Sequence, residues 1–145
     1  YETIARVVES VKIPVVANGD ITDANRARAV LNYTKAAAVM IGRGALGRPW
    51  VFAQMKAVLA GQSFDFHWAQ KAEAILSHAR AHYAYYPPVV AAQTFRKHLL
   101  WYLDSFPDFA TVRSPLCQAQ TPNEQYALLV KYFQSHGWCL NAEGC

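Results

Sequence analysis

Two short apolar runs, each ending in a glycine turn, dominate the first third of the chain. The first lies within residues 13–20 and the second within residues 38–50. Between them, residues 22–33 carry helix signals, with Thr22 as the expected side-chain cap and apolar residues at helical spacing. Near-continuous apolar strands joined by a helix predict a parallel pair covered on both faces, linked by a right-handed crossover.

The remaining pattern is helical. Apolar periodicity, together with prolines between the segments, predicts helices over residues 1–11, 49–60, 67–85, 89–105, 109–119 and 123–136. No strand pattern follows residue 61. The predicted fold class is therefore α/β plus all-α, with one domain over residues 1–61 and a helical bundle over residues 62–145.

Two helices carry explicit core predictions. In the helix over 49–60, we expect the buried stripe to be Trp50, Phe52, Met55 and Leu59. The helix over 89–105 should bury one face that continues just beyond its end, made of Ala92, Phe95, Leu99, Tyr102, Leu103 and Phe106.

The glycines after the two strands favour a phosphate site. Gly19, Gly42 and Gly44 would let backbone N–H groups approach an anion closely, and Arg43 adds a cation with a fork of donors. The alternative is that the glycines serve only tight turns and that Arg43 is solvated. Because parallel strands end at one edge, however, the two loops should lie together, as they do at the TIM-barrel phosphate site.

The amino-acid composition favours a globular protein over a membrane-spanning or disordered one. With 53% hydrophobic and 17% charged residues, the chain can bury a core, and no apolar run approaches the roughly 20 residues of a spanning helix. The net charge of +4 favours a polyanionic partner. Residues 1–66 hold eight basic and five acidic residues, against six and five in residues 67–145. Net charge therefore does not assign RNA binding to the helical half.

Cysteines and histidines give no strong candidate for catalysis or metal binding. Cys117, Cys139 and Cys145 lack metal-like spacing and an obvious activating base, which fits a reduced cytoplasmic protein. His78 and His82 are four residues apart, a spacing that can bind a metal, but no acidic or cysteine partner completes a site. We therefore predict no metal site and a surface or interhelical role for both histidines.

Three segments resemble one enzyme family. Asn18-Gly19-Asp20-Ile21 and the segment from Ile41 to Trp50, IGRGALGRPW, resemble the last two strand-loop motifs of the tRNA-dihydrouridine synthases, particularly the bacterial B-type enzymes. The segment from Arg96 to Leu103, RKHLLWYL, resembles a signature of that family's C-terminal helical domain. The resemblance fades after about Pro107.

This resemblance implies a flavoenzyme that binds FMN at the mouth of a TIM barrel and reduces uridine in tRNA to dihydrouridine, with NADPH as reductant. It implies tRNA contacts at Arg96 and Lys97, and it places the family's catalytic cysteine in an earlier loop, outside this chain. The residues expected to bind FMN, chiefly at its phosphate end, are Asn18, Gly19, Asp20, Gly42 and Arg43.

A TIM barrel needs roughly 250 residues, whereas this chain has 145. We therefore expect the C-terminal portion of a larger enzyme, inactive alone and able to self-associate through exposed barrel strands. Two alternatives remain open. One is another FMN-dependent TIM-barrel oxidoreductase acting on a small molecule, and the other is a non-catalytic RNA-binding module.

Overall fold

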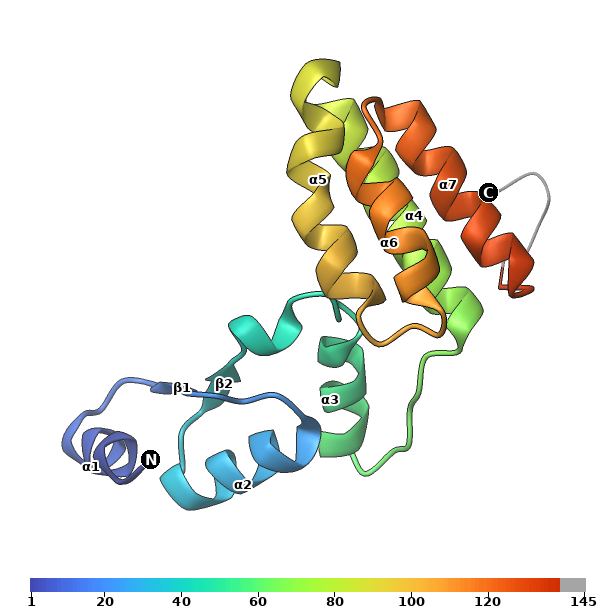
Figure 1. The fold of residues 1–145 in the computed structure, drawn as a ribbon. Coiled ribbons are helices and arrows are strands. Elements are labelled where there is room, and N and C mark those ends of the chain that lie inside the picture. The colour runs from blue at the N-terminus through green and yellow to red at the C-terminus, as the bar shows by residue number, and fades with distance from the viewer. Residues whose placement is uncertain (139–145) are drawn as a thin grey trace. The chain divides into compact units, whose positions relative to one another are not determined.

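A computed structural model describes residues 1–138 of the protein (Figure 1). They form two compact units, the first comprising residues 1–65 and the second beginning at Phe66. Across the described residues the structure is mostly helical, with one small parallel sheet.

The first unit contains the predicted strand, helix and strand. Its elements in order are α1 (Glu2–Ser10), β1 (Val16–Asn18), α2 (Ala24–Thr34), β2 (Ala38–Met40), the short 3-10 helix η1 (Arg43–Ala45) and α3 (Val51–Leu59). Strands β1 and β2 pair in parallel, with Asn18 opposite Met40. The parallel pairing is therefore confirmed. Within residues 1–138 neither strand has a second neighbour, so both outer edges of this sheet lack a strand partner.

Helix α2 is capped one residue later than predicted. The Asp23 carboxylate, not the Thr22 hydroxyl, accepts a hydrogen bond from the backbone N–H of Arg26 at 2.9 Å. This bond lowers the pKa of Asp23. Thr22 instead donates to the Asp23 carboxylate at 3.3 Å. An aspartate in the cap position has its oxygen close to the exposed N–H groups of the first turn, which explains the difference.

The core of the first unit gathers between the sheet, α2 and α3. Its buried side chains are Ala17, Ile21, Ala27, Val30, Ala36, Val51 and Met55. Trp50 is also buried, but Phe52 and Leu59 are 52% and 40% exposed, so the predicted stripe of α3 was wrong for those two. Val51 and Met55 form the buried face because their spacing of four residues places them one above the other.

Within residues 66–138 the second unit contains four helices. They are α4 (Trp68–Tyr85), α5 (Pro88–Leu103), α6 (Phe109–Gln118) and α7 (Pro122–Ser135). Prolines 88 and 122 occupy the first turns of α5 and α7, where a missing N–H costs nothing. The predicted buried face of α5 is confirmed, since Ala92, Phe95, Leu99, Tyr102, Leu103 and Phe106 are all buried.

One buried amide joins all four helices of this unit. Gln125, on α7, is fully buried, and its Nε2 donates to the carbonyls of Leu116 on α6 at 2.8 Å and Ala92 on α5 at 3.3 Å. Its Oε1 accepts from the Tyr83 hydroxyl of α4 at 2.7 Å. Leu116 lies in the last turn of α6, where carbonyls lack intrahelical partners, so Gln125 satisfies a group that the helix leaves open.

Crossing a bilayer requires a helix that is both long and apolar, and none of the helices within residues 1–138 meets both requirements.

Candidate functional site

The loops after β1 and β2 meet around one pocket. Parallel pairing places the carboxyl ends of both strands at one edge of the sheet, so the two loops leave from neighbouring positions. Together they line a pocket of about 310 Å³, whose residues are Asn18, Gly19, Asp20, Ile21, Thr22, Gly42, Arg43 and Gly44. All five residues expected to bind the cofactor therefore surround one space.

The polar groups of this pocket include an ion pair between the loops. Arg43 Nη2 lies 2.9 Å from Asp20 Oδ1, and the two side chains are 88% and 81% exposed. Solvent screens an ion pair this exposed, so it contributes little to the stability of the fold. Asp20 has a φ of 43° and Gly19 a φ of 145°. The backbone of the first loop therefore turns sharply as it enters the pocket.

Gly44 allows the two loops to touch. A Cβ atom at this position would lie 2.6 Å from the carbonyl oxygen of Ile21 and 3.1 Å from the Cα of Thr22. Both neighbours are backbone atoms, so the clash could be relieved only by moving one loop away from the other. At Gly42, in contrast, a Cβ would meet no atom within 4 Å. Gly44 is needed for packing, whereas Gly42 faces open space.

Arg48 links the two loops by hydrogen bonds. The sequence did not predict this role. Arg48 Nη2 donates to the Thr22 carbonyl of the first loop at 3.1 Å and to the Gly44 carbonyl of the second at 2.9 Å. The available signal was its place in the same glycine-rich motif, six residues after Gly42. Because a guanidinium has several donors in a fixed fork, one arginine can hold two carbonyls.

The two expected RNA contacts on α5 differ in how accessible their side chains are to solvent. Lys97 is exposed, and Trp101, four residues later on the same helix, is 40% exposed. Arg96 is half-buried, and its Nη2 donates to the carbonyl of Ala119, just beyond α6, at 3.1 Å. Its Nε atom is buried and makes no hydrogen bond within residues 1–138. Lys97 is therefore the more accessible cation.

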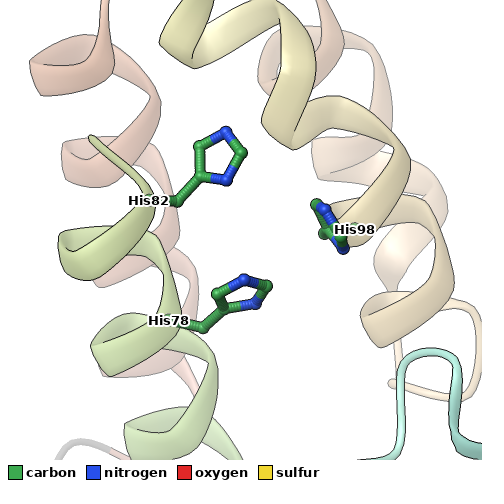
Figure 2. A group of neighbouring side chains, drawn as sticks. All are labelled: His78, His82 and His98. Carbon is green, nitrogen blue, oxygen red and sulfur yellow. The ribbon is translucent and has the colours of Figure 1, made fainter. Parts of the chain in front are cut away.

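Three histidines lie together between α4 and α5 (Figure 2). His78 and His82 come from α4 and His98 from α5, and one ring nitrogen from each lies within 4.8 Å of the others. Burial lowers the pKa of His78 and of His82, and lowers the pKa of His98 to about 4. Burial therefore favours the neutral form of each of the three rings. His98 was the partner that spacing within α4 could not reveal, because it comes from the facing helix.

The structure places one of the three cysteines. Cys117 lies half-buried in α6 as a free thiol, while Cys139 and Cys145 fall outside the described residues. Cys117 belongs to the helical unit, whereas every residue of the loop pocket belongs to the first unit.

Comparison with known proteins identifies the family. A family model described as dihydrouridine synthase (Dus) matches residues 1–136. The tRNA-dihydrouridine synthase B of Shewanella oneidensis is 40% identical over 135 residues, which cover 92% of this chain and 42% of that protein. The tRNA-dihydrouridine synthase B of Xanthomonas axonopodis pv. citri is 41% identical over 137 residues, covering 93% of this chain and 41% of that protein.

The tRNA-dihydrouridine synthase B of Escherichia coli K12 is 38% identical over 137 residues, covering 93% of this chain and 43% of that protein. This chain thus spans about two fifths of the length of the curated relatives that it matches. Since the family model covers nearly all of the described residues, the chain belongs to the dihydrouridine synthase family.

Proposed function

We propose that this chain is the C-terminal portion of a flavin-dependent tRNA-dihydrouridine synthase, which reduces uridine in tRNA to 5,6-dihydrouridine with FMN as cofactor and NADPH as reductant. The family match over residues 1–136 supports the reaction class. The observation that carries the assignment to this chain's residues is the shared pocket of the two loops, which collects Asn18, Gly19, Asp20, Gly42 and Arg43.

The pocket fits the phosphate end of FMN. Gly42 leaves open space where a side chain would otherwise stand, and Arg43 supplies a cation suited to phosphate geometry. Asp20 holds the Arg43 guanidinium at 2.9 Å across the pocket. We assign Gly42 to close approach of the phosphate, Arg43 to charge neutralisation and Asp20 to positioning of Arg43. When bound, FMN supplies the hydride that reduces the C5–C6 double bond of uridine.

We further propose that β1, α2 and β2 are the last strand-helix units of a TIM barrel, and that α4–α7 form a tRNA-binding helical bundle. Lys97 and Arg96 are the proposed tRNA contacts, with Lys97 presenting its ammonium directly to solvent. No residue of this chain is assigned a catalytic role. The catalytic cysteine would come from the part of the enzyme that precedes this segment, and a tRNA substrate implies the cytoplasm.

Because the proposed catalytic cysteine lies outside this chain, we predict that the 145-residue chain alone forms no dihydrouridine. Two strands cannot enclose a cofactor as a closed barrel does, and no cysteine of this chain is assigned to protonate the uracil ring. The purified chain should therefore leave tRNA unmodified in the presence of FMN and NADPH. Dihydrouridine formed by the chain alone would contradict this assignment of roles.

A chimera tests the function directly. The chain replaces the matching C-terminal segment of the E. coli K12 relative, and the chimera is expressed in a strain whose tRNA lacks dihydrouridine. Mass spectrometry of the tRNA nucleosides should then detect dihydrouridine. A chimera that folds and retains FMN but forms none would refute the proposed function.

Two arginine variants of the chimera separate phosphate binding from general charge. Arg43→Ala should release FMN during purification, with loss of the flavin absorbance. Arg6→Ala removes an exposed arginine from α1 and should retain the flavin. Equal flavin content in both variants would show that Arg43 does not hold the phosphate.

A further inference from the structure

The histidine cluster between α4 and α5 has the composition of a metal site. His78 and His82 project from one face of α4 because they are one helical turn apart, and His98 faces them from α5 (Figure 2). One nitrogen from each ring lies within 4.8 Å of the others, and the ring centroids of His78 and His98 are 4.9 Å apart. Two facing helices thus supply three imidazoles to one small region.

The hydrogen bonds of His82 determine which nitrogen is free. Its Nε2 lies 2.8 Å from the Thr94 hydroxyl. That hydroxyl already donates its single hydrogen to the backbone of α5, at 2.9 Å from the Val90 carbonyl and 3.2 Å from the Ala91 carbonyl. The Thr94 oxygen must therefore accept from His82 Nε2–H. The His82 ring also hydrogen-bonds the backbone of Ala91. With the ring hydrogen on Nε2, Nδ1 is the nitrogen whose lone pair can bind a metal.

His78 has a matching arrangement. Its Nδ1 lies 2.9 Å from the Tyr102 hydroxyl, and in the tautomer that donates from Nδ1 the Nε2 lone pair can bind a metal. Metal-binding histidines usually donate their second nitrogen to a polar partner that fixes the ring, and Thr94 and Tyr102 are placed to act as such partners. The His98 ring lies against both other imidazoles, with centroid distances of 4.9 Å to His78 and 5.8 Å to His82.

We propose that His78, His82 and His98 bind one divalent transition-metal ion, with Zn²⁺ as the best match, and that water occupies the fourth coordination position. Three imidazole nitrogens with one open position form a common zinc ligand set. The cluster contains no carboxylate, which disfavours Mg²⁺ and Ca²⁺ because those ions prefer oxygen ligands.

Small side-chain movements complete the site. With Zn–N bonds of about 2.0–2.1 Å in tetrahedral geometry, ligand nitrogens lie roughly 3.3 Å apart. The spacing of up to 4.8 Å therefore requires the rings to close by about 1.5 Å at most, within reach of χ rotations. Phe95 packs against all three rings at centroid distances of 5.0–5.6 Å. This apolar wall limits competing water around the ligands.

A bound ion would join α4 to α5 at the position next to Lys97. The positive charge of Lys97 opposes a cation at His82 and His98, just as it helps to lower the pKa of both rings. Because Lys97 is exposed, solvent and salt screen this repulsion. The three histidines therefore determine whether the metal binds, and Lys97 lowers the affinity for it.

The test is titration of the intact 145-residue chain with ZnCl₂, and with CoCl₂ as a spectroscopic probe. We expect one equivalent to bind with a Kd below about 100 µM, and bound Co²⁺ to show the intense visible absorption of four-coordinate geometry. Nitrogen-detected NMR of the histidine rings should show coordination through His82 Nδ1 and His78 Nε2. This last measurement uses the unmutated chain and does not depend on how variants fold.

Variants separate ligands from positioning residues. His98→Gln should weaken binding by more than about 100-fold, whereas Tyr102→Phe should weaken it by roughly 10–100-fold because it removes only the partner of a ligand. His67→Asn is the matched control, since His67 lies outside the cluster and asparagine can still cap α4. Absence of saturable binding below about 100 µM, or binding unchanged in His98→Gln, would overturn the proposal.

Discussion

Replacing Gln125 with leucine tests whether one amide holds the helical unit together. The substitution introduces an apolar side chain of similar size and removes the amide groups that bond to Tyr83, Leu116 and Ala92. Each buried donor or acceptor left without a partner costs about 1–3 kcal/mol. Ala92 contributes little, because its carbonyl lies inside α5, where the helix itself supplies a donor. The Tyr83 hydroxyl and the Leu116 carbonyl are the two groups that lose their partner.

The expected loss is therefore about 2–4 kcal/mol in the free energy of unfolding, after allowing for the greater hydrophobicity of leucine. A typical domain has only 5–15 kcal/mol in total, so the loss should be plain in a urea denaturation curve followed by circular dichroism. Amide hydrogen exchange should accelerate in α6 and α7 more than in β1 or β2, because the lost bonds lie in the helical unit.

Gln134→Leu is the matched control on the same helix. Gln134 is exposed, so the same chemical change should alter stability by less than about 0.5 kcal/mol. A double-mutant cycle with Tyr83→Phe should give a coupling energy of roughly 0.5–3 kcal/mol, since both side chains share one hydrogen bond. A loss below about 1 kcal/mol in Gln125→Leu, or no coupling to Tyr83, would refute the reasoning.

Three further predictions concern other parts of the chain. Gly44→Ala should destabilise the first unit by about 1–3 kcal/mol, because its Cβ would press on the Ile21 carbonyl, and faster hydrogen exchange in β1 and β2 should report the change. Lys97→Gln should tighten Zn²⁺ binding while weakening a salt-sensitive tRNA gel shift, and movement of both in one direction would contradict the proposed roles. Burial, with a smaller effect of the Asp108 carboxylate, raises the pKa of Tyr132 to about 12. The unfolded chain therefore loses this proton first, so stability should fall as the pH rises from about 10 to about 12, and less steeply in Tyr132→Phe.

The sequence pattern was sufficient for the elements whose signals are local. Prolines and apolar periodicity located α4, α5 and α7, and two apolar runs ending in glycine located β1 and β2. The buried face of α5 followed from spacing alone, because a helix that packs on one side repeats every three to four residues. Short-range rules failed at the start of α2, where Thr22 and Asp23 both suit a cap and only the local backbone decides between them.

Features that depend on two distant segments could not be predicted. Arg48 holds carbonyls of both loops, but nothing in its neighbours shows that residue 22 comes within its reach. His98 completes the histidine cluster only because α5 faces α4 at that level. Phe52 was assigned to the core of α3 because it is apolar, yet which face of a helix is buried depends on where α2 lies. The resemblance to a known family supplied the functional assignment that periodicity could not.

Within residues 1–138 both outer edges of the β1–β2 sheet lack a strand partner, so we expect the first unit to be able to pair with other strands at two edges. Each outer strand presents N–H and C=O groups to whatever strand approaches it, and Val16 and Met40 add faces that are 55% and 54% exposed. A unit that can pair at both edges does not stop at a dimer unless the geometry closes a ring. We therefore expect this chain to form longer assemblies, and not only dimers, at high concentration. If a peptide strand covered one edge, only the other edge could pair, and the assembly would be limited to dimers.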